Sequence, residues 1–217
     1  MVKGTEFLPV SRDEMIHRGW YYYDFLVVTA DGYIDHPSFG SAIIARLLES
    51  EGADYLAVSC LDEAMELRSA GITMPLLILG HTPKEQVEKL IENHITQAVT
   101  CKAKALEYSE EAVRCGGTLK VHIKVDTGMS RLGYLVSGAH FESGVEGICE
   151  ACRLPGLDAE GIFTHFAVSD EEDRESRAYT REQFDLFTSV IEKAEEKLGR
   201  KFALRHCANT GAVAYWP

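Results

Sequence analysis

The sequence has no long apolar run and no long run of basic residues. No apolar stretch approaches the ~18 residues that a membrane-spanning helix needs. The formal net charge of −12 argues against nucleic acid and anionic membranes as partners, because like charges repel. Residues 1–15 lack the apolar core of a signal peptide. We therefore expect a cytoplasmic protein with neither a membrane nor a nucleic-acid partner.

The chain also lacks the glycine-rich fingerprints of common nucleotide-binding folds. Neither G-x-G-x-x-G nor G-x-x-x-x-G-K-[ST] occurs, which argues against a Rossmann or P-loop fold. We expect the six cysteines to be reduced, because the cytoplasm keeps thiols in that state. Cys149 and Cys152 form one C-x-x-C, for which metal or redox use and plain packing on a helix face are the alternatives. Because no second pair exists, we favour packing and expect no metal site.

Short runs rich in β-branched residues recur along the chain and predict strands. Amphipathic stretches lie between them, and two are clear helices over residues 38–50 and 180–198, the second with a Thr180–Gln183 capping-box spacing. The predicted strands cover residues 24–29, 54–58, 75–79, 95–99, 119–125, 158–164 and 202–207.

Strands that are each followed by a helix predict an α/β fold with a parallel sheet. Seven such units favour a (β/α)₈ TIM-barrel-like architecture that stops one strand short, although an open doubly wound sheet fits the same pattern. We expect residues 1–217 to form a single barrel-like domain, incomplete or closed by oligomerisation. Two unpaired strand edges favour a homo-oligomer.

Ligands of both architectures bind at the carboxyl ends of the strands. There, "VHIKVD" places Lys124 and His122 on the inner face, and a buried lysine needs a partner or a modification. An ion pair with Asp126 or with a carboxylate of a neighbouring strand is the plain alternative. Arg131 follows a glycine-containing turn, from which it reaches a bound ligand or lies solvated on the surface.

Two further segments carry polar groups at strand ends. His165 follows a predicted strand and acts either as a base or as a core histidine whose hydrogen bonds are made within the protein. Thr210 and Gly211 open a short helix, whose free amides and hydroxyl suit a phosphate or a small anionic ligand, although capping explains the same threonine.

These residues lie in segments that resemble the N-terminal barrel domain of alanine racemase, a pyridoxal phosphate (PLP) enzyme. The resemblance runs from about Gly52 to Pro217. It is carried by "EGADYLAVSCLDEAMELRSAGI", "LKVHIKVDTGMSRLGY", "EGIFTHFAVSDEED" and "HCANTGAVAYWP", of which K-V-D-T-G-M-x-R-L-G is the most diagnostic.

The resemblance implies a role for each matching residue. Lys124 matches a lysine that is often carbamylated, and the resulting anion holds the arginine that matches Arg131, which contacts the phenolic oxygen of PLP. His165 matches a histidine near the cofactor ring. Asn209 and Thr210 match an Asn-Ser pair whose hydroxyl holds the phosphate.

The first fifty residues depart from the racemase pattern. The family reads V-V-K-A-x-x-Y-G-H-G where this chain reads "VVTADGYIDHPSFG", so Thr29 replaces the lysine that forms the Schiff base with PLP. Tyr33 matches the family's phosphate-binding tyrosine. Residues 1–50 resemble the first βα unit of a radical-SAM protein family, but no C-x-x-x-C-x-x-C occurs to hold an iron–sulfur cluster. We therefore interpret the chain as a chimera, with a foreign unit over residues 1–50 and racemase-like units two to seven over residues 51–217.

The resemblance also implies which parts of a racemase the sequence does not contain. The Schiff-base lysine, the eighth strand and the C-terminal β domain with its catalytic tyrosine have no counterpart, so no catalytic residue is intact and we expect no turnover. Non-covalent PLP binding is the first hypothesis. A structural fold-hybrid without a ligand, or a fragment of an active amino-acid racemase that needs a partner chain, is the alternative.

Overall fold

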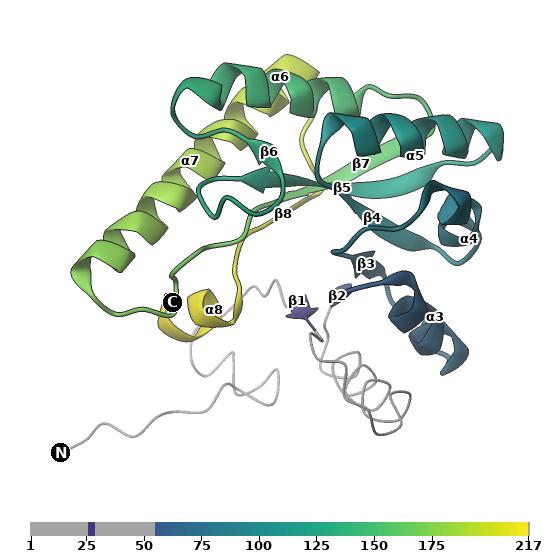
Figure 1. The fold of residues 1–217 in the computed structure, drawn as a ribbon, viewed down its shortest axis with the longest axis horizontal. Helices are drawn as coiled ribbons and strands as arrows, with labels where there is room; N and C mark the ends of the chain where they lie inside the picture. The colour runs from purple at the N-terminus through teal and green to yellow at the C-terminus, as the bar shows by residue number, and fades with distance from the viewer. Residues whose placement is uncertain (1–25, 29–54, 217) are drawn as a thin grey trace.

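A parallel sheet forms the centre of the protein (Figure 1). The structure is a computed structural model that describes residues 26–28 and 55–216. The main path of the sheet has the strand order β1-β2-β3-β4-β5-β7-β8, and every neighbouring pair is parallel. The strand order follows the chain order, which is typical of a barrel and excludes a doubly wound sheet. The predicted α/β fold, an incomplete TIM-like barrel, is thus confirmed as a half-barrel.

Each predicted strand that falls within the described residues is present. The strands are β1 (Leu26–Val28), β2 (Tyr55–Val58), β3 (Leu76–Ile78), β4 (Ile95–Val99), β5 (Leu119–Asp126), β7 (Leu157–Phe163) and β8 (Leu204–His206). The short β6 (Tyr134–Leu135) was not predicted and pairs with the carboxyl end of β5. Two residues are too few to show an alternating pattern.

Helices cover the outside of the curved sheet, while the last one follows β8 (Figure 1). They are α3 (Leu61–Ser69), α4 (Val87–Glu92), α5 (Lys102–Arg114), α6 (Phe141–Cys152), α7 (Arg174–Leu198) and α8 (Thr210–Tyr215), with 3-10 turns at Lys84–Gln86 and Gly138–His140. The helix predicted over residues 38–50 lies outside the described residues. Within the described part of the chain, no helix has the length and apolarity needed to cross a membrane.

The predicted start of α7 was wrong. Asp173 caps this helix, because its carboxylate accepts hydrogen bonds from two backbone amides of the first turn. Thr180 therefore lies within the helix, where its hydroxyl donates to the carbonyl of Ser176. The spacing of Thr180 and Gln183 resembles a capping box only in sequence. The side chain of Gln183 is buried and forms hydrogen bonds with residues outside α7.

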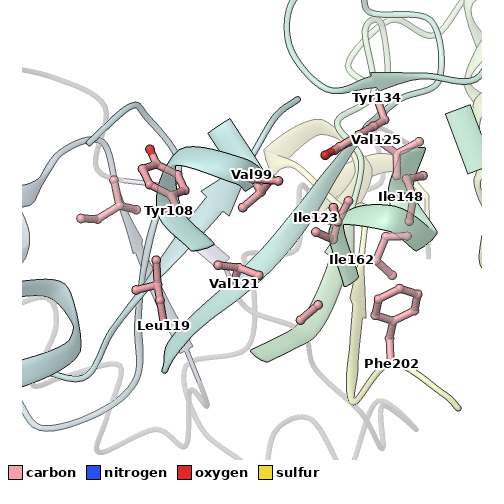
Figure 2. Close-up of a cluster of buried hydrophobic side chains, with 14 of the residues drawn as sticks. Val99, Tyr108, Leu119, Val121, Ile123, Val125, Tyr134, Ile148, Ile162 and Phe202 are labelled. Atoms are coloured by element: carbon pink, nitrogen blue, oxygen red, sulfur yellow. The ribbon is translucent and has the colours of Figure 1, made fainter. Parts of the chain in front are cut away.

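The main hydrophobic core lies between the sheet and the helices. On β5 the side chains of Leu119, Val121, Ile123 and Val125 are fully buried and belong to this core (Figure 2). The alternate residues point to the inner side, since side chains alternate along a strand. His122 and Lys124 therefore line the inside of the half-barrel, as the alternating sequence predicts.

The inner face of the sheet holds a partly buried polar network beside β5. The register of β5 and β7 shifts at Val121/His122, so that Glu160 is the extra residue of β7. Its carboxylate accepts a hydrogen bond from the Tyr55 hydroxyl (3.0 Å) and pairs with Lys120 (2.7 Å). The imidazole of His122, whose Nε2 lies 3.8 Å from Oε1, and the ammonium of Lys120 keep the pKa of Glu160 at about 2, although partial burial opposes this. This network ties β2, β5 and β7 together below the strand ends.

Candidate functional site

The turn after β5 carries the first group of predicted site residues. Asp126 ends the strand, and its Oδ1 accepts hydrogen bonds from the amides of Gly128 and Ser130 (both 3.0 Å). This turn needs a backbone conformation with positive φ at Gly128 (142°) and at Ser130 (57°). The folded turn presents Arg131 with an exposed side chain directly behind the strand end.

Lys124 lies in the last part of β5 and is only 7% exposed. Its ammonium donates to the carbonyl of Val125 (2.7 Å) and lies 5.5 Å from the centre of the Phe163 ring. No carboxylate among the described residues forms an ion pair with it, so the alternative of a pairing with Asp126 or with a neighbouring strand is not observed there. Asp126 instead binds the backbone of its own turn. Burial lowers the pKa of Lys124 to about 8, against the opposing effect of Asp126 and with the help of Arg131.

His165 follows β7 and faces the same group of cations. Burial lowers the pKa of its imidazole, and the positive charges of Arg131 and Lys124 lower it further. The imidazole is therefore neutral at pH 7. A neutral ring beside two cations can accept a hydrogen bond from a ligand, or donate one, without adding charge.

Asn209 and Thr210 lie at the start of α8. Asn209 caps this helix through Oδ1, which accepts from the amide of Ala212 (2.9 Å). Its Nδ2 lies 3.5 Å from Nε2 of His165 and so connects the β8 end to the β7 end. Within the described residues, the Thr210 hydroxyl and the amides of Thr210 and Gly211 make no hydrogen bond. They remain free to bind an anion.

The structure thus brings together Lys124, Arg131, His165 and Asn209, with Thr210 beside them at the carboxyl ends of β5, β7 and β8. Thr29 and Tyr33 lie outside the described residues. Thr29 directly follows β1, whose last residue, Val28, pairs with Ala57 of β2.

His206 is a half-buried group that we did not predict from the sequence. Its Nε2 lies 3.0 Å from Nδ1 of His122, and its ring stacks on Phe163 at 4.8 Å. Burial, His122 and Lys124 lower its pKa to about 3. Its position at the end of a predicted strand was the sequence feature that could have indicated a site residue. Its partner, His122, lies 84 residues away in the sequence, so the contact itself was not predictable.

The C-x-x-C lies far from this cluster in the fold. Cys149 is fully buried in the helix core, and Cys149 and Cys152 both lie on α6, outside the sheet. The described residues contain no group of three or more His, Cys, Asp or Glu side chains suited to a metal ion.

The cluster has the chemistry needed to bind an anionic aromatic aldehyde such as PLP. Two cations face one side of it, a neutral imidazole adjoins them, and free amides with a hydroxyl suit a phosphate. Oδ1 of Asp126 accepts hydrogen bonds from two backbone amides, which partly offset the negative charge of this carboxylate. The residues present therefore fit this cofactor.

Comparison with known families supports the same identification. The family described as "Alanine racemase, N-terminal domain" matches residues 26–217. The match begins before the boundary near residue 52 that we expected, so the likeness includes the unit around Thr29. The radical-SAM resemblance and the separate origin of residues 1–50 stay predictions.

Individual relatives agree with the family match. An alanine racemase of Clostridium perfringens is 43% identical over 191 residues, which cover 88% of this chain and 46% of that protein. Alanine racemase 2 of Caldanaerobacter subterraneus is 41% identical over 187 residues, or 86% of this chain and 45% of that protein. The solved alanine racemase of Clostridium difficile 630 in complex with cycloserine superposes with a TM-score of 0.74 at 37% identity, over 87% of this chain and 48% of that one. The chain thus spans about half the length of the relatives that it matches.

Proposed function

The chain belongs to the alanine racemase family, and from this premise we propose that it forms the PLP-binding side of an amino-acid racemase site. The family is PLP-dependent. The observation that supports the proposal is the gathering of Lys124, Arg131, His165 and Asn209 at one end of the half-barrel. When bound, PLP supplies an electron sink that stabilises negative charge on the carbon next to an amino group.

The phosphate of PLP would be held at the start of α8. The Thr210 hydroxyl and the amides of Thr210 and Gly211 would donate to its oxygens, and Tyr33 would add a further donor. Asn209 keeps these groups in place, because it caps the helix and also bonds to the carbonyl of Phe166 (3.2 Å).

Lys124 and Arg131 would face the ring side of the cofactor. With a pKa of about 8, a substantial fraction of Lys124 is the neutral amine near pH 7.5. The neutral amine is the form that adds to carbon dioxide and releases a proton. The carbamate so formed is an anion that would pair with the Arg131 guanidinium and fix it beside the ring.

Thr29 decides how the cofactor is held. A threonine side chain has no amine, so PLP would bind without a covalent bond to residue 29 and without turnover. Lys124 remains near the site but donates to the carbonyl of Val125 and takes the positioning role described above.

Borohydride reduction of the PLP-saturated protein, followed by peptide mass spectrometry, tests this proposal. We expect saturable PLP binding with no reduced adduct in the unmodified chain. Thr29→Lys should give an adduct at residue 29, while Thr29→Arg, the matched control, adds a positive charge without a reactive amine and should give none. An adduct at Lys124 in the unmodified chain would overturn the proposed mode of binding. Absence of any PLP binding would favour a structural role without a ligand.

We also propose that the half-barrel self-associates. Among the described strands, β1 and β8 each pair on one side only, and such edges are free to bind another strand. Size-exclusion chromatography with light scattering should show a dimer or larger species at micromolar concentration. A monomer over the whole concentration range would contradict this.

A further inference from the structure

Gln183 on α7 is a buried side chain that contacts two loops of the candidate site at once. It is 1% exposed. Its Nε2 donates to the Thr127 hydroxyl (3.1 Å) and, at 3.5 Å, toward the carbonyl of His165. Its Oε1 accepts from the amide of Ala167 (3.0 Å). One amide group therefore joins the loop after β5 to the loop after β7.

The hydrogen bonds of this contact run in a fixed direction. The Thr164 hydroxyl donates to the carbonyl of Val125 (3.0 Å) and lies 2.8 Å from the Thr127 hydroxyl. A hydroxyl has one hydrogen, so Thr127 must donate to Thr164 and must itself accept from residue 183. Only a side chain with an N–H or O–H at position 183 can donate the hydrogen bond that the Thr127 hydroxyl accepts. A buried carboxylate would remove the donor and add a charge.

Tyr179 lies one helical turn before Gln183 and forms its hydrogen bond with the first of the two loops. Its hydroxyl donates to the carbonyl of Gly128 (2.8 Å). A Cβ at Gly128 would lie 2.3 Å from that hydroxyl, so glycine allows this close approach. Tyr179 therefore offers a comparison, because its hydrogen bond goes to the β5 loop.

We propose that Gln183 is a positioning residue that holds residues 127–131 and 164–167 as one unit. These two loops carry Arg131 and His165, so the amide of Gln183 sets the position of the arginine relative to the imidazole. Within the described residues, hydrogen bonds connect Gln183 to the backbone of the β7 loop and to the Thr127 hydroxyl, which in turn bonds to Thr164, so Gln183 acts through these groups. Its consequence for cofactor binding rests on the proposed function.

Hydrogen exchange of backbone amides tests the coupling without any ligand. Gln183→Met keeps the length of the side chain but forms none of the hydrogen bonds. We expect exchange in both segments, 127–131 and 164–167, to accelerate about tenfold. Tyr179→Phe should accelerate exchange only in 127–131, and Gln86→Met, at an exposed glutamine, should change neither. Acceleration in one segment only, or uniformly over the sheet, would overturn the proposal.

Thr127→Val removes the hydroxyl that connects Gln183 to Thr164 and so interrupts the same series of hydrogen bonds. It serves as the test variant if Gln183→Met does not fold. Where both single variants fold, the double variant should add little to the effect of either one, because both remove the same connection. Additive effects on exchange would show that the two residues act independently and would overturn the coupling.

PLP titration tests the consequence for the site. Gln183→Met should weaken PLP binding about tenfold and shift the absorption maximum of the bound cofactor, whereas Gln86→Met should do neither. Unchanged affinity and spectrum would overturn the positioning role. If the unmodified chain binds no PLP, the proposed function fails, while the exchange experiment still decides whether Gln183 couples the loops.

Discussion

The half-buried imidazole of His206 makes the stability of the fold depend on pH. Its folded pKa of about 3 lies below the value of about 6.5 in an unfolded chain. Between these values the unfolded chain binds a proton that the folded chain does not bind. The free energy of unfolding therefore falls as the pH decreases below 6.5, and it is regained as the pH rises.

The size of this effect follows from the two pKa values. If the full difference between the folded and unfolded pKa of His206 acts, the free energy of unfolding falls by about 2 kcal/mol between pH 8 and pH 5. His206 is half-buried, and solvent reduces the effect, so we expect about 1–2 kcal/mol. Glu160 contributes little in this range, because its pKa in an unfolded chain is about 4.5 and its folded value is about 2.

Urea unfolding at pH 8, 6.5 and 5 measures this loss directly. His206→Gln retains a neutral polar group toward His122 but does not titrate, so it should lose less stability between pH 8 and pH 5 than the unmodified chain. His140→Gln, at an exposed histidine, is the matched control and should follow the unmodified chain. Equal losses in His206→Gln and in the unmodified chain would refute the reasoning.

Three further substitutions test packing and hydrogen bonding. Gly161→Ala places a methyl group 2.4–2.6 Å from the ring of His122 and should lower the free energy of unfolding by about 1–3 kcal/mol in guanidinium titrations; an unchanged midpoint would contradict this. Asp173→Ala removes the α7 cap and should cost about 1 kcal/mol in thermal unfolding, whereas Asp173→Asn should retain most of it. Arg68 donates to four backbone carbonyls at 2.8–3.0 Å, so Arg68→Lys should cost about 1–2 kcal/mol by urea titration, and full stability in that variant would show that these contacts contribute little.

The sheet was predictable because its signal is local. β5 alternates between core and inner-face residues over eight positions, and that pattern alone places Lys124 and His122 inside. The α7 start was not predictable in the same way. Asp173 and Thr180 are both acceptable caps in sequence, and only the path of the chain before the helix decides between them.

The polar residues that lie together at the strand ends could be listed from the sequence, but the contacts between them could not. The sequence offers Asp126 as a partner for Lys124, two positions along the same strand. The turn that follows uses that carboxylate for its own amides. The contact between Gln183 and Thr127 joins residues 56 positions apart, and no local pattern reports such a pairing.

The alternation along β5 divides the strand into two sets of positions that can be redesigned separately. The odd-numbered residues Leu119 to Val125 specify how the sheet packs on its helices, and the even-numbered ones specify the polar surface inside. A library restricted to the even-numbered positions would explore new ligand chemistry on an unchanged core. Deletion of a single residue at the start of the strand would exchange the two sets in the rest of it, putting lysine under the helices and valine inside. It would therefore disrupt both the core packing and the polar inner surface.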